Sequence, residues 1–360
     1  MLNTPWKYIH PKFKLNGLSY QSDGLFAIAN DLINSGAHYE ISIGNFIQEW
    51  LDNNDHVVVK TSGSTGVPKN LDLSKQKMIN SAKATGTFFK LAENTTALLC
   101  LPSNYIAGKM MLVRAMVLGW NLHIVAPEKD AITQYDNDYD FVAMVPYQVR
   151  YSLKSLNKIK KLIIGGGAIS KELNDQLQGV DTEVFATYGM TETISHIAVR
   201  RINGLAQSND YTALPRVRFS LDDRNCLMID APEVSAEKVI TNDMVRLISP
   251  TSFEYLGRID NVVNSGGIKL FPEQIERKLA SYIDQPFIIA SEKNESLGEQ
   301  LILILEEDTA KETPDFKEVF LSLSSYERPK KIYVFSKFSF TETGKIKRME
   351  LLKYLEKFKK

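Results

Sequence analysis

Nine consecutive residues carry the densest set of groups in this chain that could bind an anion. They are Thr61, Ser62, Gly63, Ser64, Thr65, Gly66, Val67, Pro68 and Lys69. The glycines let backbone N–H groups approach an anion without interference from a Cβ atom. The hydroxyls add donors and Lys69 adds a positive charge, a combination that suits a polyphosphate better than a single carboxylate. The segment lacks the Gly-Lys-Ser/Thr order that opens the helix of a Walker A motif.

Further motifs follow this loop, and together they resemble the adenylate-forming superfamily, which includes acyl-CoA synthetases, luciferases and peptide-synthetase adenylation domains. The nine residues resemble its signature phosphate loop. The later matches are Tyr188–Glu192 (YGMTE), Thr241–Asp243 (TND), Tyr255–Asp260 (YLGRID), Ser265–Lys269 (SGGIK) and Thr343–Arg348 (TGKIKR). The TND motif has Asn242 where glycine is usual. The resemblance covers the chain from about residue 57 to its end.

The resemblance implies a reaction in two steps. Members join a carboxylate to ATP, release pyrophosphate, and then pass the acyl group from AMP to a thiol. Because the carboxylate and the triphosphate are both anionic, a cation placed where negative charge develops lowers the barrier. The resemblance assigns the bridging cation to Lys345, a phosphate donor to Thr191 and a Mg²⁺ ligand to Glu192. The implied cofactors are ATP, Mg²⁺ and coenzyme A.

The same resemblance implies where the nucleotide and the thiol bind. Tyr188 offers a flat face to adenine, while Asp243 accepts hydrogen bonds from both ribose hydroxyls and Arg258 reinforces that contact. Two glycines that follow a predicted strand, Gly165 and Gly166, line the adenine and the acyl group. Asp260 is the hinge about which a small C-terminal domain rotates between the two steps. Gly266 and Gly267 then let a thiol-bearing arm pass close to the backbone.

The front of the chain narrows the choice of substrate. The phosphate loop begins at residue 61, earlier than in most members, so we expect a large domain that is truncated at its front. Short o-succinylbenzoate–CoA ligases of menaquinone biosynthesis have a motif similar to Leu101–Gly108 (LPSNYIAG), with a histidine where this chain has Tyr105. A buried second carboxylate needs a cation or several donors. Arg114, in an otherwise apolar helical segment, is the expected cation, and Lys109 and His196 are alternatives.

Several functions are compatible with these residues. The expected one is an AMP-forming ligase that adenylates o-succinylbenzoate and transfers the acyl group to coenzyme A. Another aryl- or acyl-CoA synthetase would share every residue argued above except Arg114, and an adenylation domain that loads a carrier protein is also open. A non-catalytic nucleotide-binding protein is the alternative of a different class. The retained Lys69, Glu192 and Lys345 argue against it.

The elements that must position these residues alternate in type. We expect strands at Val57–Val59, Ala97–Leu101, Leu122–Val125, Phe141–Val145, Lys161–Ile164 and Val184–Ala186, and helices at Lys75–Phe89, Lys109–Leu118 and Ser170–Leu177. Ser74 and Ser170 are expected helix caps. This alternation predicts a layered α/β domain with a largely parallel sheet over residues 1–257. Residues 258–260 are the expected hinge, and 261–360 a small, mobile α+β domain that carries the lysine motif.

Composition sets the remaining bounds. Hydrophobic residues make up 44% of the 360 residues, and 43 Lys and Arg balance 43 Asp and Glu, so a nucleic-acid partner is not expected. The absence of a signal-like start and of a long apolar stretch predicts a cytoplasmic protein without membrane insertion, and two isolated cysteines fit a reducing compartment. The aromatic N-terminus (Trp6, Tyr8, Phe13, Tyr20) covers either a sheet edge or an interface between copies, which leaves a homo-oligomer open.

Overall fold

The computed structural model describes residues 4–60, 70–134, 137–283, 285–307, 316–340 and 346–358. Every strand and helix expected in the first half of the chain forms, and α3 (Lys75–Phe89) has the expected bounds. Ser170 caps α6 (Lys171–Leu177) by accepting from the Leu173 N–H at 3.1 Å. The cap expected at Ser74 was wrong. The Lys75 N–H at the start of α3 donates instead to the backbone oxygen of Asp55 at 2.8 Å.

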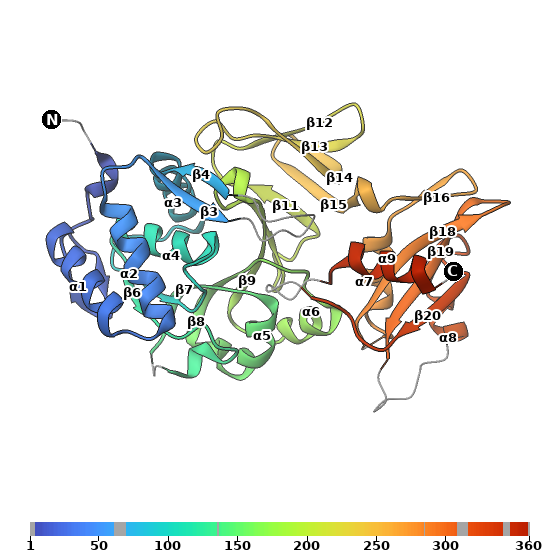
Figure 1. The fold of residues 1–360 in the computed structure, drawn as a ribbon, viewed down its shortest axis with the longest axis horizontal. Helices are drawn as coiled ribbons and strands as arrows, with labels where there is room; N and C mark the ends of the chain where they lie inside the picture. The colour runs from blue at the N-terminus through green and yellow to red at the C-terminus, as the bar shows by residue number, and fades with distance from the viewer. Residues whose placement is uncertain are drawn as a thin grey trace.

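The large unit, residues 4–258, contains a sheet of 13 strands (Figure 1). In spatial order they are β12 (Arg218–Leu221), β13 (Cys226–Asp230), β14 (Val239–Ser249), β15 (Ser252–Arg258), β11 (Asp210–Ala213), β10 (His196–Arg201), β9 (Glu183–Gly189), β8 (Ile159–Ile164), β7 (Tyr139–Met144), β5 (Thr96–Leu99), β6 (Asn121–Ile124), β1 (Lys14–Leu15) and β2 (Leu18–Ser19).

Only part of this sheet is parallel. The strands from β9 to β1 pair in parallel, whereas every pair from β9 to β12 is antiparallel. The prediction of a largely parallel sheet was therefore correct for the first half of the unit alone. The reason is connectivity: a parallel pair needs a long crossover, usually a helix, and between β9 and β15 the chain has short turns instead.

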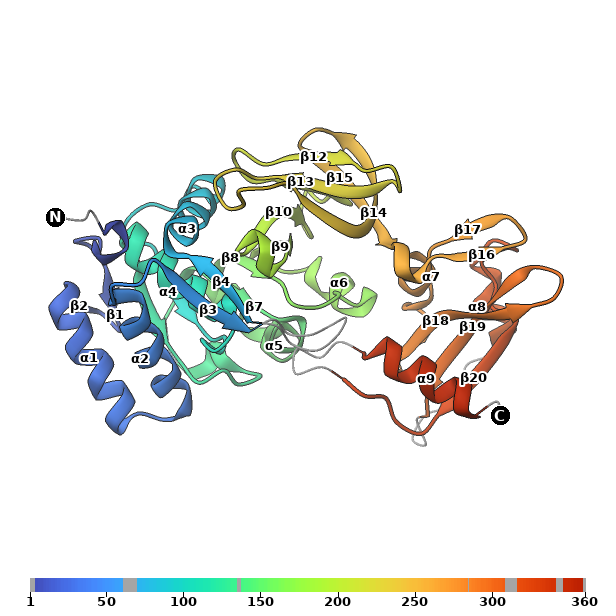
Figure 2. The same ribbon diagram turned by 45° about the horizontal axis from the view of Figure 1, so that its top comes forward.

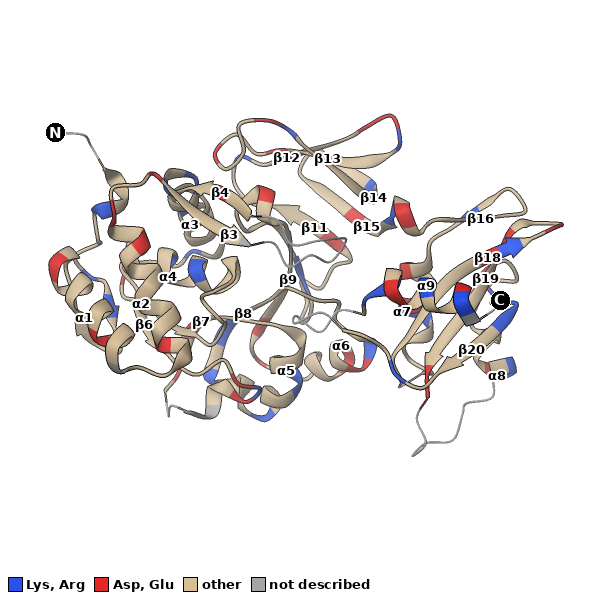
Figure 3. Ribbon diagram, in the orientation of Figure 1, with Lys and Arg blue, Asp and Glu red and all other residues tan. Residues whose placement is uncertain are grey.

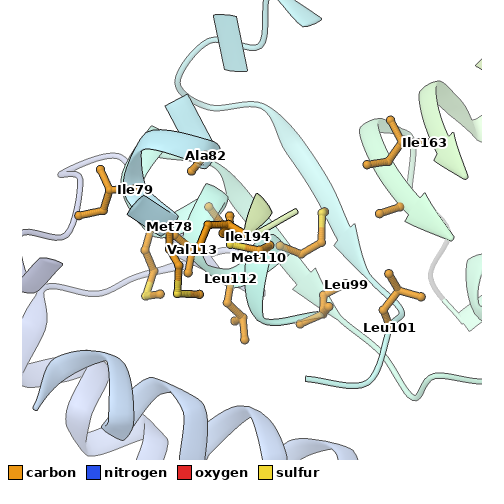
Figure 4. Close-up of a cluster of buried hydrophobic side chains, with 14 of the residues drawn as sticks. Met78, Ile79, Ala82, Leu99, Leu101, Met110, Leu112, Val113, Ile163 and Ile194 are labelled. Carbon is orange, nitrogen blue, oxygen red and sulfur yellow. The ribbon is translucent and has the colours of Figure 1, made fainter. Parts of the chain in front are cut away.

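Helices cover both faces of the parallel strands. They are α1 (Ser22–Ser35), α2 (His38–Leu51), α3, α4 (Ile106–Leu118), α5 (Pro146–Ser152) and α6. Alternate residues of one strand enter different clusters: Leu99 packs with α3 and α4, whereas Leu98 packs with α5 and α6. Figure 4 shows the first cluster, in which Met78 of α3, Val113 of α4 and Ile194 are drawn together.

α4 is the most deeply buried helix of the large unit. Its residues 108 to 116 are all buried, as expected for a helix that is apolar on every side. The two charges within this run, Lys109 and Arg114, therefore point into the protein rather than to solvent. Arg114 is therefore not a surface residue.

The N-terminus covers an edge of the large sheet. β1 pairs with β6, Phe13 is buried and Trp6 packs against the main core. The helices α1 and α2, which follow it, were not predicted. The segment that precedes the phosphate loop, β3 (His56–Lys60), pairs with β4 (Asn70–Ser74) as an antiparallel two-stranded sheet, so the loop joins two extended segments as expected.

The small unit, residues 263–358, follows the last strand of the large sheet. It contains β16 (Val263–Ser265), β17 (Ile268–Leu270), α7 (Pro272–Leu279), β18 (Phe287–Asn294), β19 (Gly298–Glu306), α8 (Phe316–Leu321), β20 (Lys331–Phe335) and α9 (Arg348–Phe358). The unit mixes helices and strands, as expected for an α+β domain. In α9, Leu351 and Leu355 are buried, and Leu352 packs on the same cluster.

The two units have separate cores. The buried apolar clusters of the large unit contain no residue of the small one, and the converse also holds for the described residues. Polar contacts join the units: Arg277 of α7 donates to the backbone oxygen of Tyr255 at 2.9 Å, and Asn261 donates to Glu273 at 2.5 Å. Figure 2 shows the small unit beside the strands β14 and β15.

Charges of both signs are interspersed over both units, in keeping with the balanced composition (Figure 3). Among the described residues, no helix is both long and apolar enough to span a bilayer.

Candidate active site

The predicted ribose-binding carboxylate is held by groups from three strands of the large sheet, β9, β14 and β15. Asp243 of β14 accepts a 2.5 Å hydrogen bond from the Tyr188 hydroxyl of β9, and its backbone N–H donates to Thr241 Oγ1 at 3.0 Å. Asp243 and Arg258 are direct partners across the β14–β15 pair, with Arg258 Nη1 3.6 Å from Asp243 Oδ1. The structure therefore brings Tyr188, Asp243 and Arg258 together, as predicted for one nucleotide site.

Burial and these partners act in opposite directions on Asp243. Burial raises the pKa of the carboxyl above its usual range, while the Tyr188 hydrogen bond and the Arg258 charge lower it. The pKa of Tyr188 lies well above its usual value, because burial and the neighbouring carboxylate both disfavour the phenolate. Tyr188 thus remains a hydrogen-bond donor at neutral pH, and Asp243 Oδ1 keeps capacity for further donors.

The ring of Tyr188 sits in a cluster of aromatic side chains. Phe253 and Tyr211 meet it edge to face, with ring centroids 5.1 and 5.8 Å away, and Tyr255 lies at 6.4 Å. These contacts fix the ring, and the hydroxyl contact with Asp243 was not anticipated from the sequence. The position of the ring is thereby tied to that of the carboxylate.

Two glycines near Tyr188 lie where a side chain would not fit. A Cβ atom on Gly189 would lie 2.3 Å from the Ser195 backbone oxygen, because Gly189 lies opposite His196 at the start of β10. Gly165 follows β8, and a Cβ on it would meet Thr187 Oγ1 at 2.7 Å. The next residue, Gly166, has a φ of +77°, which favours glycine. The predicted glycine turn therefore packs directly against β9.

The predicted phosphate and metal residues lie on a short 3₁₀ turn, Thr191–Thr193, directly after β9. Glu192 is exposed, which leaves its carboxylate accessible to a ligand. The turn is held by Thr193, a residue that sequence reasoning missed, through its hydroxyl contacts with the backbone oxygens of Met190 and Ser195. Ile194 follows with a φ of +66°, a strained conformation for a β-branched residue of the kind found near functional sites.

Arg114 lies in a buried polar cluster. Its Nε donates to Thr85 Oγ1 at 3.3 Å and its Nη2 donates to Ser195 Oγ at 3.2 Å, while Nη2 also lies 3.4 Å from His196 Nδ1. Ser195 Oγ in turn lies 2.8 Å from Ser81 Oγ. Burial lowers the pKa of Arg114 to about 9, so the side chain still carries its charge at neutral pH. Among the described residues, no carboxylate pairs with it.

The hydrogen bonds also fix the tautomer of His196. Thr85 Oγ1 donates to the backbone oxygen of Ser81 at 3.1 Å and lies 3.4 Å from His196 Nε2, so it accepts from the Nε2 hydrogen. His196 Nδ1 is then the acceptor that faces Arg114. Burial and the Arg114 charge both lower the pKa of His196 well below its usual value, which keeps the ring neutral.

The sequence alone did not identify Thr85, Ser81 and Ser195 as members of this cluster. A signal was available, because Ser81 and Thr85 lie four residues apart on the buried face of α3. Their neighbours on that face include the apolar Met78 and Ala82. Polar residues at helical spacing on a buried face require partners in the interior.

The other two substrate candidates occupy different surroundings. Lys109 Nζ lies 3.0 Å from Glu49 Oε2 of α2 and 4.3 Å from the centroid of the Phe46 ring, so its charge is balanced within the protein. Burial lowers its pKa, and Glu49 opposes that effect. Tyr105 is the residue before α4 and is half-buried. Of the predicted acid-binding residues, the structure therefore joins Arg114 and His196 and separates Lys109 from them.

A small cavity lies beside the cluster. Ser81 and His196 line it, and its volume of about 20 Å³ has room for about one water molecule. A wider groove of about 630 Å³ lies on β14, β15 and α7, and its lining residues include none of the predicted site residues. We therefore place the candidate site by its chemistry rather than by the larger groove.

Two predicted elements of the site lie outside the described residues: the phosphate loop, 61–69, and Lys345. Gly266 and Gly267 form the two-residue turn between β16 and β17, and both have positive φ values, +57° and +83°. This is the geometry of a type I′ hairpin, which glycine favours. Asp260 lies in the short turn between the two units, with its carboxylate 2.7 Å from Arg258 Nη2.

Comparison with known proteins identifies the family of the chain. The AMP-binding enzyme family matches residues 19–232, more than half of the chain, and the chain therefore belongs to that family. Its curated relatives include the 2-succinylbenzoate–CoA ligase of Escherichia coli, 24% identical over 289 residues, which cover 75% of this chain and 63% of that protein. The chain thus spans less than two thirds of the length of this relative.

Solved structures share the fold. An acyl-CoA synthetase (AMP-forming)/AMP-acid ligase II-like protein from Dyadobacter fermentans is 34% identical, with a TM-score of 0.61, and the match covers 91% of this chain and 98% of that one. An o-succinylbenzoate CoA synthetase from Bacillus subtilis, in complex with an acyl-adenylate intermediate, has a TM-score of 0.76 at 15% identity. That match covers 97% of this chain and 96% of the other.

Proposed function

We propose that this protein is an ATP-dependent, AMP-forming ligase that activates an aromatic dicarboxylate of the o-succinylbenzoate type and transfers the acyl group to coenzyme A. The observation that carries the choice of substrate is the buried Arg114. A guanidinium without a carboxylate partner is expensive to bury, and a second carboxylate on the substrate would supply the missing charge. The curated relatives named 2-succinylbenzoate–CoA ligase support the same choice.

The nucleotide would bind against β9, β14 and β15. Asp243 Oδ1 accepts from the ribose hydroxyls, while Tyr188 occupies Oδ2 and Arg258 keeps the carboxylate ionised. The direction of the Asp243 carboxylate is thus set before ATP arrives. Such preorganisation lowers the entropy lost on binding.

The metal would be bound through Glu192 and the substrate. The described residues contain no group of three or more His, Cys, Asp or Glu side chains that could hold an ion by themselves. This fits Mg²⁺, which commonly takes one or two carboxylates together with phosphate oxygens and water. When bound, Mg²⁺ would neutralise charge on the phosphates. The exposed carboxylate of Glu192, held on a rigid turn, is suited to that role.

The acid would bind through its two carboxylates at different places. Arg114 and the hydroxyl of Ser195 bind the spare carboxylate, and the neutral His196 keeps Arg114 in place through Nδ1. The reacting carboxylate would then approach the α-phosphate near Lys345, the cation that family resemblance assigns to that step. In menaquinone biosynthesis this reaction would deliver the coenzyme A thioester of o-succinylbenzoate.

The test is pyrophosphate release with ATP, Mg²⁺ and a panel of acids, measured with and without coenzyme A. The panel contains o-succinylbenzoate, benzoate and medium-chain fatty acids. Release with o-succinylbenzoate alone, together with a coenzyme A thioester, is the expected result. Turnover of a monocarboxylate instead would keep the reaction class and overturn the substrate. A thioester formed on a carrier protein but not on coenzyme A would overturn the acceptor.

A further inference from the structure

The turn between the two units is held by a side chain from β14. Asn242 Nδ2 lies 3.2 Å from Asp260 Oδ1 and 3.3 Å from Asp260 Oδ2, so the amide N–H groups donate to both carboxylate oxygens. The other end of the amide, Oδ1, accepts from Arg224 Nη1 at 3.0 Å. Both ends of the Asn242 amide are thus hydrogen-bonded. Its NH₂ group faces the acceptor Asp260, and its oxygen faces the donor Arg224.

Arg224 is itself fixed. Its Nη2 donates to the backbone oxygen of Thr241 at 2.9 Å, and its Nε donates to Asp222 Oδ2 at 2.8 Å. The chain of contacts therefore runs from the β12–β13 turn through Asn242 to Asp260. On the opposite side Arg258 Nη2 lies 2.7 Å from Asp260 Oδ2 and its Nη1 3.6 Å from Asp243.

Asn242 is also the position at which this chain departs from its family motif, where glycine is usual. Glycine has no side chain and could make none of these contacts. Through Asn242, the strand that carries the ribose-binding Asp243 also holds the residue at which the small unit is expected to pivot.

We propose that Asn242 is a positioning residue that stabilises the adenylation arrangement of the two units by holding Asp260. In Figures 1 and 2 the start of α9 faces the large unit, and the tip of the β16–β17 hairpin points away from it. The two-step reaction assigns the face with the C-terminal motif to adenylation and the hairpin face to thioester formation. This inference rests on the proposed function, because that function gives the arrangement its catalytic role. The distance measurement described below does not depend on it.

The energetic effect is modest and directional. Hydrogen bonds to a charged group are stronger than neutral ones, but Asp260 is exposed, so water competes for it. Loss of these bonds is expected to lower the ratio of the adenylation arrangement to all others about fivefold. Asn242→Asp has the same shape, and it replaces the donor with a charge that repels Asp260. Asn242→Gly restores the usual family residue and removes the contact without repulsion.

The first measurement is the distance between spin labels on the two units. Lys171→Cys on α6 and Lys353→Cys on α9 are exposed, whereas the native Cys100 and Cys226 are buried and would not be labelled. Asn242→Asp and Asn242→Gly should each broaden the distance distribution and reduce the main population. Gln176→Glu, on the surface of α6, is the control for an amide-to-acid change and should leave the distribution unaltered. An unaltered distribution in both Asn242 variants would overturn the proposal.

The second measurement separates the two half-reactions. Adenylation is followed by pyrophosphate exchange, and thioester formation by single turnover of preformed acyl-adenylate with coenzyme A. Both Asn242 variants should slow the first, by at most about fivefold, and leave the second unchanged or faster. Equal slowing of both steps would show a structural role only. If the wild-type protein exchanges no pyrophosphate with any acid, the proposed function fails, while the spin-label distances still decide the role of Asn242.

Discussion

Arg114 Nη2 donates to Ser195 Oγ across 3.2 Å, which joins α4 to the segment between Glu192 and β10. Only two residues, Thr193 and Ile194, therefore separate the Glu192 carboxylate, which is suited to Mg²⁺, from the Ser195 hydroxyl, which accepts from the buried guanidinium. The strained Ile194 lies within that short link. In the proposed function, one short segment of the backbone thus contacts both the metal and the spare carboxylate of the acid.

Arg114→Met should raise the stability of the protein and weaken its use of a dicarboxylate. The variant removes a buried charge that lacks a carboxylate partner, so we expect the free energy of unfolding to rise by about 1–2 kcal/mol. The KM for a dicarboxylate should rise at least tenfold, with little change for a monocarboxylate. Thermal unfolding and initial rates with both acids measure these effects.

Lys109→Met is the matched control on the same helix. It leaves Glu49 without its partner at 3.0 Å, so it should lower stability rather than raise it. Equal destabilisation by the two variants would contradict the view that Arg114 lacks a balancing charge.

His196→Gln should make the free energy of unfolding less dependent on pH below about 6.5. Burial holds the pKa of His196 well below its unfolded value of about 6.5, so the unfolded chain binds more protons below that pH. The wild-type protein should therefore be most stable above about pH 6.5. As the pH falls below that value, it should lose up to about 1.4 kcal/mol per pH unit through this residue. Urea unfolding of both proteins at several pH values tests this, and identical slopes would argue against a neutral His196.

Tyr188→Phe should move the pH dependence of ATP use. Burial already raises the pKa of Asp243, and loss of the Tyr188 hydrogen bond would raise it further. The acid limb of kcat/KM for ATP should then shift to higher pH. Tyr211→Phe, which alters a neighbouring ring, is the control and should leave the limb in place. A profile for Tyr188→Phe that matches the wild type would show that the hydroxyl does not tune Asp243.

Gly189→Ala should be strongly destabilising. The added Cβ would lie 2.3 Å from a backbone oxygen and 2.6 Å from His196 Cα, so β9 and β10 must move apart. We expect a loss of about 3 kcal/mol and impaired binding of ATP. Gly179→Ala provides the comparison, since a Cβ added there would have no atom within 4 Å, and it should be nearly neutral. Chemical denaturation of the two variants decides the point.

Lys345→Ala should separate the half-reactions. If Lys345 bridges the carboxylate and the α-phosphate, the variant should lose adenylation and keep thioester formation from a preformed acyl-adenylate. Pyrophosphate exchange and single-turnover thioester assays provide the two readouts. Loss of both steps in a folded variant would contradict an exchange of two arrangements.

The sequence predicted the secondary structure well where hydrophobic period and turn chemistry agree. The bounds of α3 are an example, because its apolar positions repeat at helical spacing. It did not reveal that the sheet turns antiparallel after β9. Strand direction depends on the connections, and short apolar runs look alike in both kinds of sheet.

The site was predictable in part for the same reason. Motif spacing placed Asp243 and Arg258 in one site, and the structure pairs them across two strands. Partners from distant segments, such as Thr85 and Ser195 around Arg114, leave no local pattern, since they meet only when α3, α4 and β10 pack together. Asn242 was noted as a departure from the family motif, but its contact with Asp260 depends on tertiary structure.

Because the two hydrophobic cores are separate, the small unit can rotate relative to the large one at a low cost in free energy. Among the described residues, no apolar cluster spans the two units, and the contacts described between them are hydrogen bonds such as that from Arg277 to the Tyr255 carbonyl. Water can replace such bonds when the units part, whereas it cannot compensate an opened core. A large rotation of the small unit would thus leave the heat capacity of the protein almost unchanged, because it exposes little apolar surface.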